Sequence, residues 1–541
     1  MKVKLKAVSI FLVVLSFFCL SLAFQGCSSS NSTSPGYSEL LFWSDGSTIH
    51  TGSVNGSTRT SLGSATIPGI PGTYTRTGTL VTVTMPNHNL PQSGFWVDLV
   101  FSAGTGGTAT SGNYQVTIVD ANTFTVNDSA SGTITGGAVL RKPAITLDAT
   151  YSQSGTTTIT ITLANHNLKA NNIVQLHFTS GTAVDAAIKI ASVVDANTFT
   201  VTAASAATTS GDVQVTVGGN YTIFSIAMHP NGRWVYTTST YDCAKGDPFC
   251  WGSGLISRFA VNWYTGALTF EESTVTGVTT NSAPVTANFS PDGTLLFNQD
   301  DDLDGLQMWN VNATDGTLTL AASSANDVTF MHGVCVSSDG TRVYNGNNVF
   351  SFTSSSITRI YAGSGGESNV IIGSTLYSAD YASIWEIRTF SLSNPDVPSV
   401  IATASTNTLN QAREIAVSSD GKRIVSAGWG GIKSYDYNGT SITPAVGAGD
   451  TQYIDGGGLS WPTYSSGNPS VTTKMFRSVN LNNAGNMIAT AYFTMEHSRL
   501  MGLPPSGVML FNLAADGSLS LANDYSDATY ARVAKFFTRP Y

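Results

Sequence analysis

A short hairpin motif recurs through the second half of the chain. Residues 290–297 read Ser-Pro-Asp-Gly-Thr-Leu-Leu-Phe, and related stretches begin at His229, Ser337, Ser418 and Asn482. Asp or Asn followed by Gly suits a tight turn that needs a positive φ angle, and the flanking Val, Ile, Phe and Tyr residues favour strands. A hairpin that recurs at long intervals predicts an array of similar sheets.

The glycines of these turns indicate the period of the array. They are Gly232, Gly293, Gly340, Gly373, Gly421 and Gly485, of which Gly373 marks a degenerate copy, and neighbouring glycines lie 33 to 64 residues apart. These distances centre on the length of a four-stranded propeller blade. Six turns therefore predict six blades.

The two ends of the chain predict a seventh blade. Residues 37–66 contain three strands that lack the first strand of a four-stranded unit, whereas residues 531–537 resemble a first strand alone. Pairing the two would close the ring and hide its strand edges. We therefore expect an all-β fold, a seven-bladed β-propeller closed by a C-terminal strand. Its first blade (strands 2–4) occupies residues 37–70, and the remaining blades and the closing strand occupy residues 219–541.

The segment between the first two blades is duplicated. Residues 81–90 match residues 159–168, with Asn-His-Asn-Leu at the end of each, and Asp-Ala-Asn-Thr-Phe follows at residues 120–124 and 195–199. The strict apolar–polar alternation predicts two small β domains, at residues 71–142 and 143–218. They resemble the small β-barrel repeats of phage tail and bacterial surface proteins, a resemblance that implies no chemistry. We expect His88 and His166 to be turn residues bonded to the backbone, because each unit supplies one histidine.

The N-terminus indicates export. Residues 1–6 are basic, residues 7–24 are almost wholly apolar, and Gly26-Cys27 leads into a Ser-rich tether at residues 28–36. The pattern resembles a bacterial lipoprotein signal peptide (residues 1–27), which implies lipidation at Cys27 and a place on the periplasmic or extracellular face of the cell envelope. Plain secretion is the alternative, because Phe24 departs from the usual Leu.

Composition and cysteine placement agree with an exported protein. Charged residues are 11% of the chain, and 34 acidic against 25 basic residues give a net charge of −9, which disfavours nucleic acid as a partner. Cys243 and Cys250 share one Gly/Pro-containing loop and predict a disulfide, whereas Cys335 is expected to be a buried free thiol. The expected partners are the membrane, through the lipid anchor, and an envelope protein, a glycan or a small-molecule ligand.

The aligned hairpins resemble the lactonase-type (6-phosphogluconolactonase-like) seven-bladed propellers. Residues 288–309 carry the resemblance most fully, and it extends over about residues 221–541. Its motifs mark a superfamily that enzymes and non-enzymes share, so it predicts the fold rather than an activity.

The resemblance also implies a position for a site. In this family the residue eight positions before the turn glycine is often His or Arg and lies at the mouth of the central channel. Here that position holds His332, Arg413 and Arg477, with Arg532 as a fourth by alignment, but Phe224 and Val285 in two other blades. Cationic groups there would suit an anionic or carbonyl-bearing ligand, and the adjacent Glu414 could act as a general base on water. The alternative is that these groups line a wet channel and hold the blades together.

Two further groups are candidates for ligand binding. Asp300, Asp302 and Asp304 form an acidic turn that could hold Ca²⁺ through carboxylate oxygens, although its spacing matches no known calcium loop. His497, beside Glu496, is a weaker candidate for a ligand-binding residue.

Two functions therefore remain open. The first is a lipid-anchored module that binds a ligand or a protein at the cell envelope. The second is a lactonase that hydrolyses a cyclic ester with His332, Arg413, Glu414 and Arg477 as catalytic residues. A lactone panel assayed with an Arg413→Ala control separates them.

Overall fold

The computed structural model describes residues 36–67, 70–85, 88, 90, 93–94, 96–142, 145–166, 168, 170, 173–184, 186–217, 221–241, 254–276, 284–300, 305–324, 333–363, 366–380, 386–405, 412–428, 431–445, 453–454, 472–496, 502–528 and 531–540. Over these residues the chain is all-β and contains no helix. Accordingly, none of them forms a helix that is long and apolar enough to cross a membrane.

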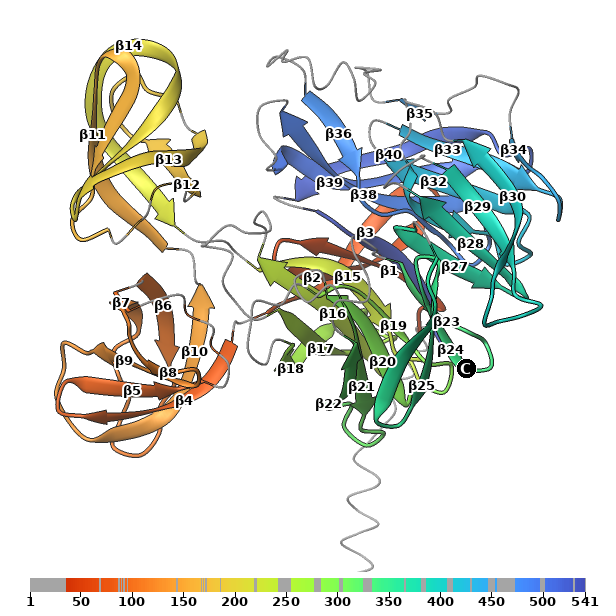
Figure 1. Cartoon of the computed structure of the whole chain (residues 1–541), viewed down its shortest axis with the longest axis horizontal. Coiled ribbons are helices and arrows are strands. Elements are labelled where there is room, and N and C mark those ends of the chain that lie inside the picture. The colour runs from red at the N-terminus through yellow and green to blue at the C-terminus, as the bar shows by residue number, and fades with distance from the viewer. Residues whose placement is uncertain are drawn as a thin grey trace, which may run out of the picture.

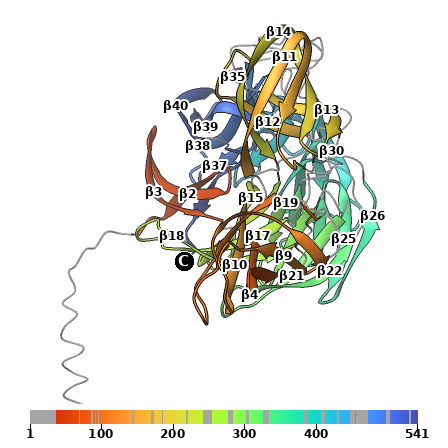
Figure 2. The same ribbon diagram turned by 90° about the vertical axis from the view of Figure 1, so that its left-hand side faces the viewer.

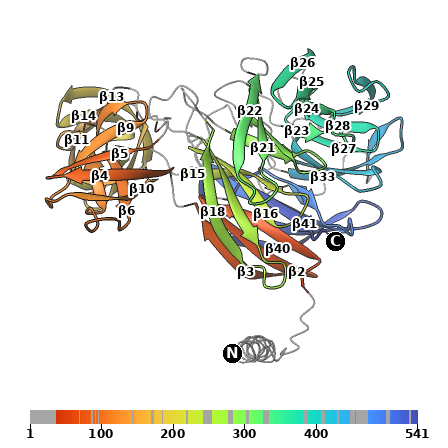
Figure 3. The same cartoon turned by 90° about the horizontal axis from the view of Figure 1, so that it is seen from below.

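Among the described residues, seven sheets share one plan, in which four strands pair as antiparallel neighbours. The first sheet joins the two ends of the chain and contains β1 (Glu39–Asp45), β2 (Thr48–Asn55), β3 (Thr58–Thr66) and β41 (Ala534–Thr538). The expected pairing of the C-terminal strand with this sheet is present, because β41 runs antiparallel to β1 with Leu41 opposite Phe536. Figure 3 shows β41 in the same region as β2 and β3, with which it shares the sheet.

The other six sheets of this plan follow in chain order. The second sheet contains β15 (Tyr221–Met228), β16 (Trp234–Tyr241), β17 (Leu255–Val261) and β18 (Leu268–Val275), and the third contains β19 (Pro284–Phe289), β20 (Leu295–Asp300), β21 (Gly305–Val311) and β22 (Leu318–Ser324). The fourth contains β23 (Val334–Val336), β24 (Arg342–Asn345), β25 (Asn348–Thr353) and β26 (Ser356–Tyr361), and the fifth contains β27 (Ser368–Ile372), β28 (Thr375–Asp380), β29 (Glu386–Ser391) and β30 (Ser399–Ser405). The sixth contains β31 (Ala412–Val417), β32 (Arg423–Gly428), β33 (Gly431–Tyr437) and β34 (Ile442–Pro444), with β35 (Tyr453–Ile454) paired to β33. The seventh contains β36 (Thr472–Phe476), β38 (Met487–Glu496), β39 (Gly502–Leu513) and β40 (Leu519–Ala528), with β37 (Asn480–Leu481) paired to β38.

The innermost strands of successive sheets pack against one another. β15 contacts β19, β19 contacts β23, β23 contacts β27, and β27 contacts β31. β31 then contacts β37, β37 contacts β41, and β1 of the first sheet contacts β15 of the second. The outer strand β3 of the first sheet also lies beside β18 of the second (Figure 2). The succession of sheets therefore returns to its start, with the last step made through β1, which pairs with the innermost strand β41.

Two further sheets lie between the first and second sheets in the chain. One contains β4 (Ile70–Thr77), β5 (Leu80–Thr84), β6 (Trp96–Phe101), β7 (Gly112–Gln115), β8 (Thr117–Asp120), β9 (Thr123–Asn127) and β10 (Ile134–Lys142), and the other contains β11 (Ile145–Thr162), β12 (Ile173–Phe178), β13 (Ala186–Asp195) and β14 (Thr198–Val217). We call them the first and second module sheets. They stand to one side of the other sheets, in orange and yellow in Figure 1.

The hairpin turns explain the recurring motif. In the turn before β20, Ser290 Oγ donates a hydrogen bond to Asp292 Oδ1 (2.6 Å), and the Leu295 amide donates to Ser290 Oγ (2.9 Å). Gly293 then has a φ of 73°, which favours glycine over any residue with a side chain. The hydrogen bond from Ser290, with others from the turn, lowers the pKa of Asp292. Each element of the Ser-x-Asp-Gly motif is therefore needed by the turn.

The two histidines of the module sheets are structural, as predicted. His88 Nδ1 accepts a hydrogen bond from the Leu90 amide (3.0 Å), and its Nε2 lies 2.8 Å from the carbonyl oxygen of Asp120. His166 repeats both contacts, with the Leu168 amide at 2.9 Å and the Asp195 carbonyl at 3.1 Å. The backbone therefore fixes the Nε2–H tautomer of both imidazoles, and burial lowers the pKa of each.

The module sheets differ in one buried position. In the first, Arg76 forms an ion pair with Asp128, and both side chains are buried. In the second, Tyr-Ser-Gln replaces the Tyr-Thr-Arg sequence, and the Gln153 amide donates to the carbonyl oxygens of Thr156 (2.7 Å) and Ser205 (2.9 Å). One duplicated framework thus encloses a charged pair in one copy and a neutral amide in the other.

Candidate functional site

A cavity of about 450 Å³ lies where the innermost strands of the sheets come together. Its lining includes four cationic side chains, Arg413, Arg477, Arg532 and Lys535, and two carboxylates, Glu367 and Glu414. Four positive and two negative formal charges leave an excess of two positive charges, whereas the whole chain carries −9. The cavity is therefore a cationic site in an acidic protein.

Irregular backbone places several of these residues in the lining. The pairing of β31 with β32 shifts register between Ala412 and Glu414, so Arg413 is the extra residue of a β-bulge. Arg477 lies between the end of β36 and the start of β37, where the strand is likewise interrupted. A bulge turns a side chain away from the direction that regular pleating would give it, and bulges are common beside active sites.

The same irregularity occurs in two other sheets at the equivalent position. β15 shifts register around Phe224 against β16, and β19 shifts register around Val285 against β20. Both residues line the cavity. The position eight residues before the turn glycine is thus a bulge that faces the cavity whether the residue is basic or apolar.

Two of the four cationic side chains make defined contacts with neighbouring side chains. Arg413 Nη1 lies 3.5 Å from Glu367 Oε1, and both side chains are largely buried. The Arg532 guanidinium lies over the Phe224 ring, with its central carbon 3.9 Å from the ring centroid. The charge of Arg413 is thus partly neutralised by Glu367. The flat guanidinium of Arg532 is held against the ring of Phe224 by a cation–π interaction.

Side-chain hydrogen bonds fix the spacing between neighbouring inner strands. Ser368 Oγ accepts from the Ile415 amide (3.2 Å), Ser478 Oγ accepts from the Ala534 amide (2.9 Å), and Asn480 Oδ1 accepts from the Phe536 amide (2.8 Å). These bonds join the fifth sheet to the sixth and the seventh sheet to β41. Small polar residues on the inner strands therefore hold the cavity wall together.

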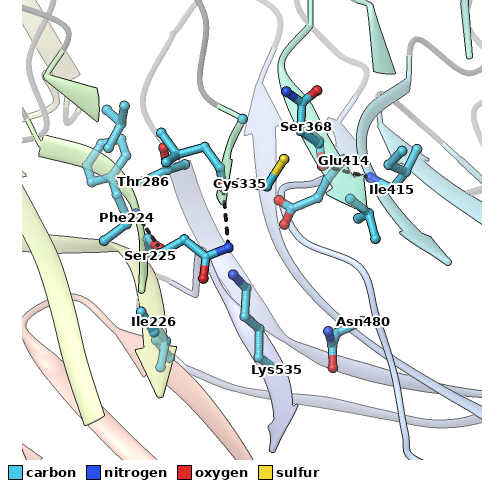
Figure 4. A pocket seen from close by; sticks show the side chains of 18 of the residues that line it. Phe224, Ser225, Ile226, Thr286, Cys335, Ser368, Glu414, Ile415, Asn480 and Lys535 are labelled. Carbon is cyan, nitrogen blue, oxygen red and sulfur yellow. Dashed lines mark hydrogen bonds between the residues drawn. The ribbon is translucent and has the colours of Figure 1, made fainter. Parts of the chain in front are cut away.

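Figure 4 shows two oppositely charged side chains in this space. The Glu414 carboxylate and the Lys535 ammonium group extend from different strands toward the region between the inner strands. A carboxylate close to several cations can accept a proton from water while the cations stabilise negative charge on a substrate oxygen. The lining thus contains the groups for anion binding and for a simple hydrolysis.

The structure brings together four of the predicted site residues. Arg413, Glu414, Arg477 and Arg532 all line the one cavity. The other predicted residues, with one exception, lie outside the described residues, namely His332, His497, Asp302, Asp304, Cys27, Cys243 and Cys250. The exception is Asp300, which is the last residue of β20 and is fully buried.

Two charged residues of the lining have no motif that marks them. Glu367 lies just before β27 in the fifth sheet, where the turn at Gly373 departs from the consensus and the eight-residue spacing does not reach it. Lys535 lies on β41 and is recognisable only once that strand is known to be innermost in its sheet.

Cys335 also lines the cavity and is buried with a free thiol, as predicted. Burial raises the pKa of this thiol, so it stays protonated at neutral pH and is a poor nucleophile. Over the described part of the chain, no group of three His, Cys, Asp or Glu side chains could hold a metal ion. Calcium binding near Asp300 therefore stays a prediction.

No family model and no curated protein matches the chain. Its backbone resembles solved 6-phosphogluconolactonase-like β-propeller proteins at low identity. The "putative 6-phosphogluconolactonase" of Bacteroides fragilis is 13% identical with a TM-score of 0.43, over 68% of this chain and 98% of that one. The periplasmic gluconolactonase of Pseudomonas aeruginosa is 13% identical with a TM-score of 0.42, over 68% of this chain and 100% of that one. This likeness is too distant to carry an argument about function, which must come from the cavity.

Proposed function

We propose that the protein is an exported, lipid-anchored β-propeller that binds a small anionic ligand in its central cavity. The observation that carries the proposal is the convergence of Arg413, Arg477, Arg532 and Lys535 on one space, where the described part of the lining contains two carboxylates. Guanidinium groups bind carboxylates and phosphates through paired hydrogen bonds, and such bonds are stronger in a cavity than in water. A cavity of about 450 Å³ is within the usual size of small-molecule sites.

The architecture proposed for this protein is a closed propeller of seven blades. Its support is the shared strand order of the seven sheets, the succession of inner strands that contact one another, and the pairing of β41 with β1. The module sheets are then two small domains inserted after the first blade, as the duplicated sequence predicts. In this arrangement the cavity is the central channel of the ring.

The proposed location rests on the N-terminal sequence. The basic start, the apolar run and Gly26-Cys27 match the pattern of a lipoprotein signal, and the Ser-rich residues that follow would serve as a tether. A lipid on Cys27 would hold the propeller at the bacterial cell envelope, on its periplasmic or extracellular face. The ligand would then be a molecule that occurs outside the cytoplasm.

Binding of small anions to the purified full-length protein tests the function. Isothermal titration with a polyhydroxy carboxylate, a hydrophobic carboxylate and inorganic phosphate should give saturable binding by at least one of them. Because a charge-assisted hydrogen bond contributes about 1.5–3 kcal/mol, Arg477→Gln should weaken that binding at least tenfold. Arg413 is not used for this test, because it forms an ion pair with the buried Glu367.

Arg359→Gln is the matched control, since Arg359 is exposed on the outer strand β26. It should leave the affinity unchanged. If none of the three anions binds, or if Arg477→Gln binds as tightly as the unaltered protein, the proposed function is wrong.

A lactonase remains the alternative, and the placement of Glu414 with three arginines in one cavity favours it. Glu414 would take a proton from water as the water oxygen bonds to the lactone carbonyl carbon. The carbon–oxygen bond of the ring would then break, and the leaving alkoxide would take the proton back from Glu414. If Glu414→Gln abolishes turnover of a lactone but retains binding of the hydroxy-acid product, the protein is an enzyme. If no lactone of a panel is turned over, ligand binding is the one proposed function that remains.

A further inference from the structure

The cavity wall divides into two arcs of different chemistry. Its cations come from neighbouring sheets: Arg413 from the sixth, Arg477 from the seventh, and Arg532 and Lys535 from the first. The next two sheets in the succession supply Phe224 and Val285 at the equivalent bulge. Charge is therefore gathered on one side of the space and apolar surface on the other.

The fourth sheet continues the apolar arc. Val334 and Cys335 line the cavity there, and both are buried side chains that carry no charge at neutral pH. Together with Phe224 and Val285, they give three consecutive sheets whose lining, over the described residues, is largely apolar. We call these four residues the apolar arc, and the four cations the cationic arc.

The polar residues among the apolar arc are largely engaged by the protein itself. Ser225 Oγ accepts a hydrogen bond from the Ala287 amide (3.4 Å), and the Asn288 side-chain amide donates to the Val334 carbonyl (3.4 Å). The Thr286 hydroxyl is the exception, because it is buried and has no hydrogen-bond partner among the described residues. This side of the cavity thus offers few polar groups to a ligand.

The two arcs meet at the contact between Arg532 and Phe224. The guanidinium lies 3.9 Å from the centre of the ring, so the cationic and apolar surfaces are continuous at this point. A ligand whose acid group lies beside Arg532 would therefore place the next part of its structure against Phe224. At the opposite border, Glu367 pairs with Arg413 and limits the cationic arc.

We infer that the ligand is an amphipathic anion, a carboxylic acid with a hydrocarbon body, rather than a polyhydroxylated acid. This inference rests on the proposed anion-binding function and names its ligand class. The acid group would bind the cationic arc, and the hydrocarbon would displace water from the apolar arc. A sugar acid of the same length would have to bury several hydroxyl groups against Phe224 and Val285, where the Thr286 hydroxyl could pair with no more than one or two of them, and burying the rest is unfavourable.

Three probes of similar size test the inference on the full-length protein by isothermal titration calorimetry. Octanoate has the charge and the hydrocarbon, gluconate has the charge with hydroxyl groups, and octanamide has the hydrocarbon without the charge. Octanoate should bind at least tenfold more tightly than either of the others. If gluconate binds as tightly as octanoate, the ligand class is wrong while anion binding stands. If octanamide binds as tightly as octanoate, or if no probe binds, the proposed anion-binding function is wrong as well.

Two substitutions separate the arcs. Val285→Thr replaces a methyl group with a hydroxyl at nearly constant volume. It should lower the affinity for octanoate about fivefold and leave the affinity for gluconate unchanged. Arg477→Gln should lower the affinity for both octanoate and gluconate at least tenfold. Val400→Thr is the control, because Val400 is 58% exposed on the outer strand β30. An unchanged octanoate affinity in a folded Val285→Thr protein would overturn the two-arc arrangement.

Discussion

The buried ion pair of the first module sheet gives a sharp stability prediction. Asp128 accepts hydrogen bonds from Arg76 and from the amides of Thr110 (3.0 Å) and Ala130 (3.1 Å). Asp128→Asn keeps the shape of the side chain but removes its charge, so Arg76 remains buried without a counter-charge. Removing one partner of a buried pair costs about 3–5 kcal/mol. We expect the stability of the sheet to fall by about 3 kcal/mol, the lower figure, because the asparagine oxygen can still accept a hydrogen bond from the backbone.

Hydrogen exchange followed by mass spectrometry on the full-length protein measures this loss locally. Peptides from residues 70–142 of the Asp128→Asn protein should exchange faster, by about a hundredfold for 3 kcal/mol. Peptides from residues 145–217 should be unchanged, because Gln153 takes the corresponding position without charge. Asp148→Asn is the control, since Asp148 is exposed and its substitution should have little effect.

The pH dependence follows from the same pair. Burial alone would raise the pKa of Asp128, but the hydrogen bonds from Thr110, Ala130 and Arg76 together hold it below its usual range. The stabilisation is therefore complete above the unfolded-state pKa of about 4, and is lost as the pH falls through the lower folded-state value. Acid should lower the protection against exchange, relative to the intrinsic exchange rates at each pH, more in the first module sheet than in the second. An equal loss of protection in both, or an unchanged Asp128→Asn protein, would refute the role of the pair.

Three further predictions concern the ends of the chain and its cysteines. Deleting residues 531–541 removes β41, so the melting temperature in calorimetry should fall by at least 10 °C; an unchanged value would contradict closure through this strand. Cys27→Ser should abolish metabolic labelling with palmitate and release the protein from the membrane fraction, whereas persistent labelling would exclude Cys27 as the lipid site. After denaturation without reductant, Cys335 should react with maleimide while Cys243 and Cys250 do not, and reaction of all three would exclude the disulfide.

Local turn chemistry explains why the fold was largely predictable from the sequence. Gly232, Gly293, Gly340, Gly421 and Gly485 all have φ between 67° and 73°, so the motif that was counted marks a backbone requirement rather than a coincidence. His88 and His166 were predictable for a similar reason, since a lone histidine in a turn finds its partners in the adjacent backbone. Such signals depend on neighbours in the chain.

The residues of the cavity were predictable only where they lie at a fixed spacing from the turn glycines. Arg413 and Arg477 lie at a fixed distance before their turn glycines, and at that distance the strand is irregular and its side chain lines the cavity. Glu367 and Lys535 reach the cavity through the packing of one sheet against the next, which no spacing within the chain encodes. The division of the cavity wall into two arcs likewise depends on which sheets are neighbours, and the spacing of residues in the sequence does not give this.

The C-terminal strand has a consequence for how the site is made. Arg532 lies just before β41 and Lys535 lies within it, and β41 pairs with β1, the first strand that the structure describes. Two of the four cations of the cavity therefore take their places only when strands from distant parts of the sequence have paired. A protein cleaved before β41 would keep the strands of the other six sheets but would lose these two charges from the cavity wall. Half of the positive charge in the proposed site thus depends on the pairing that completes the first sheet.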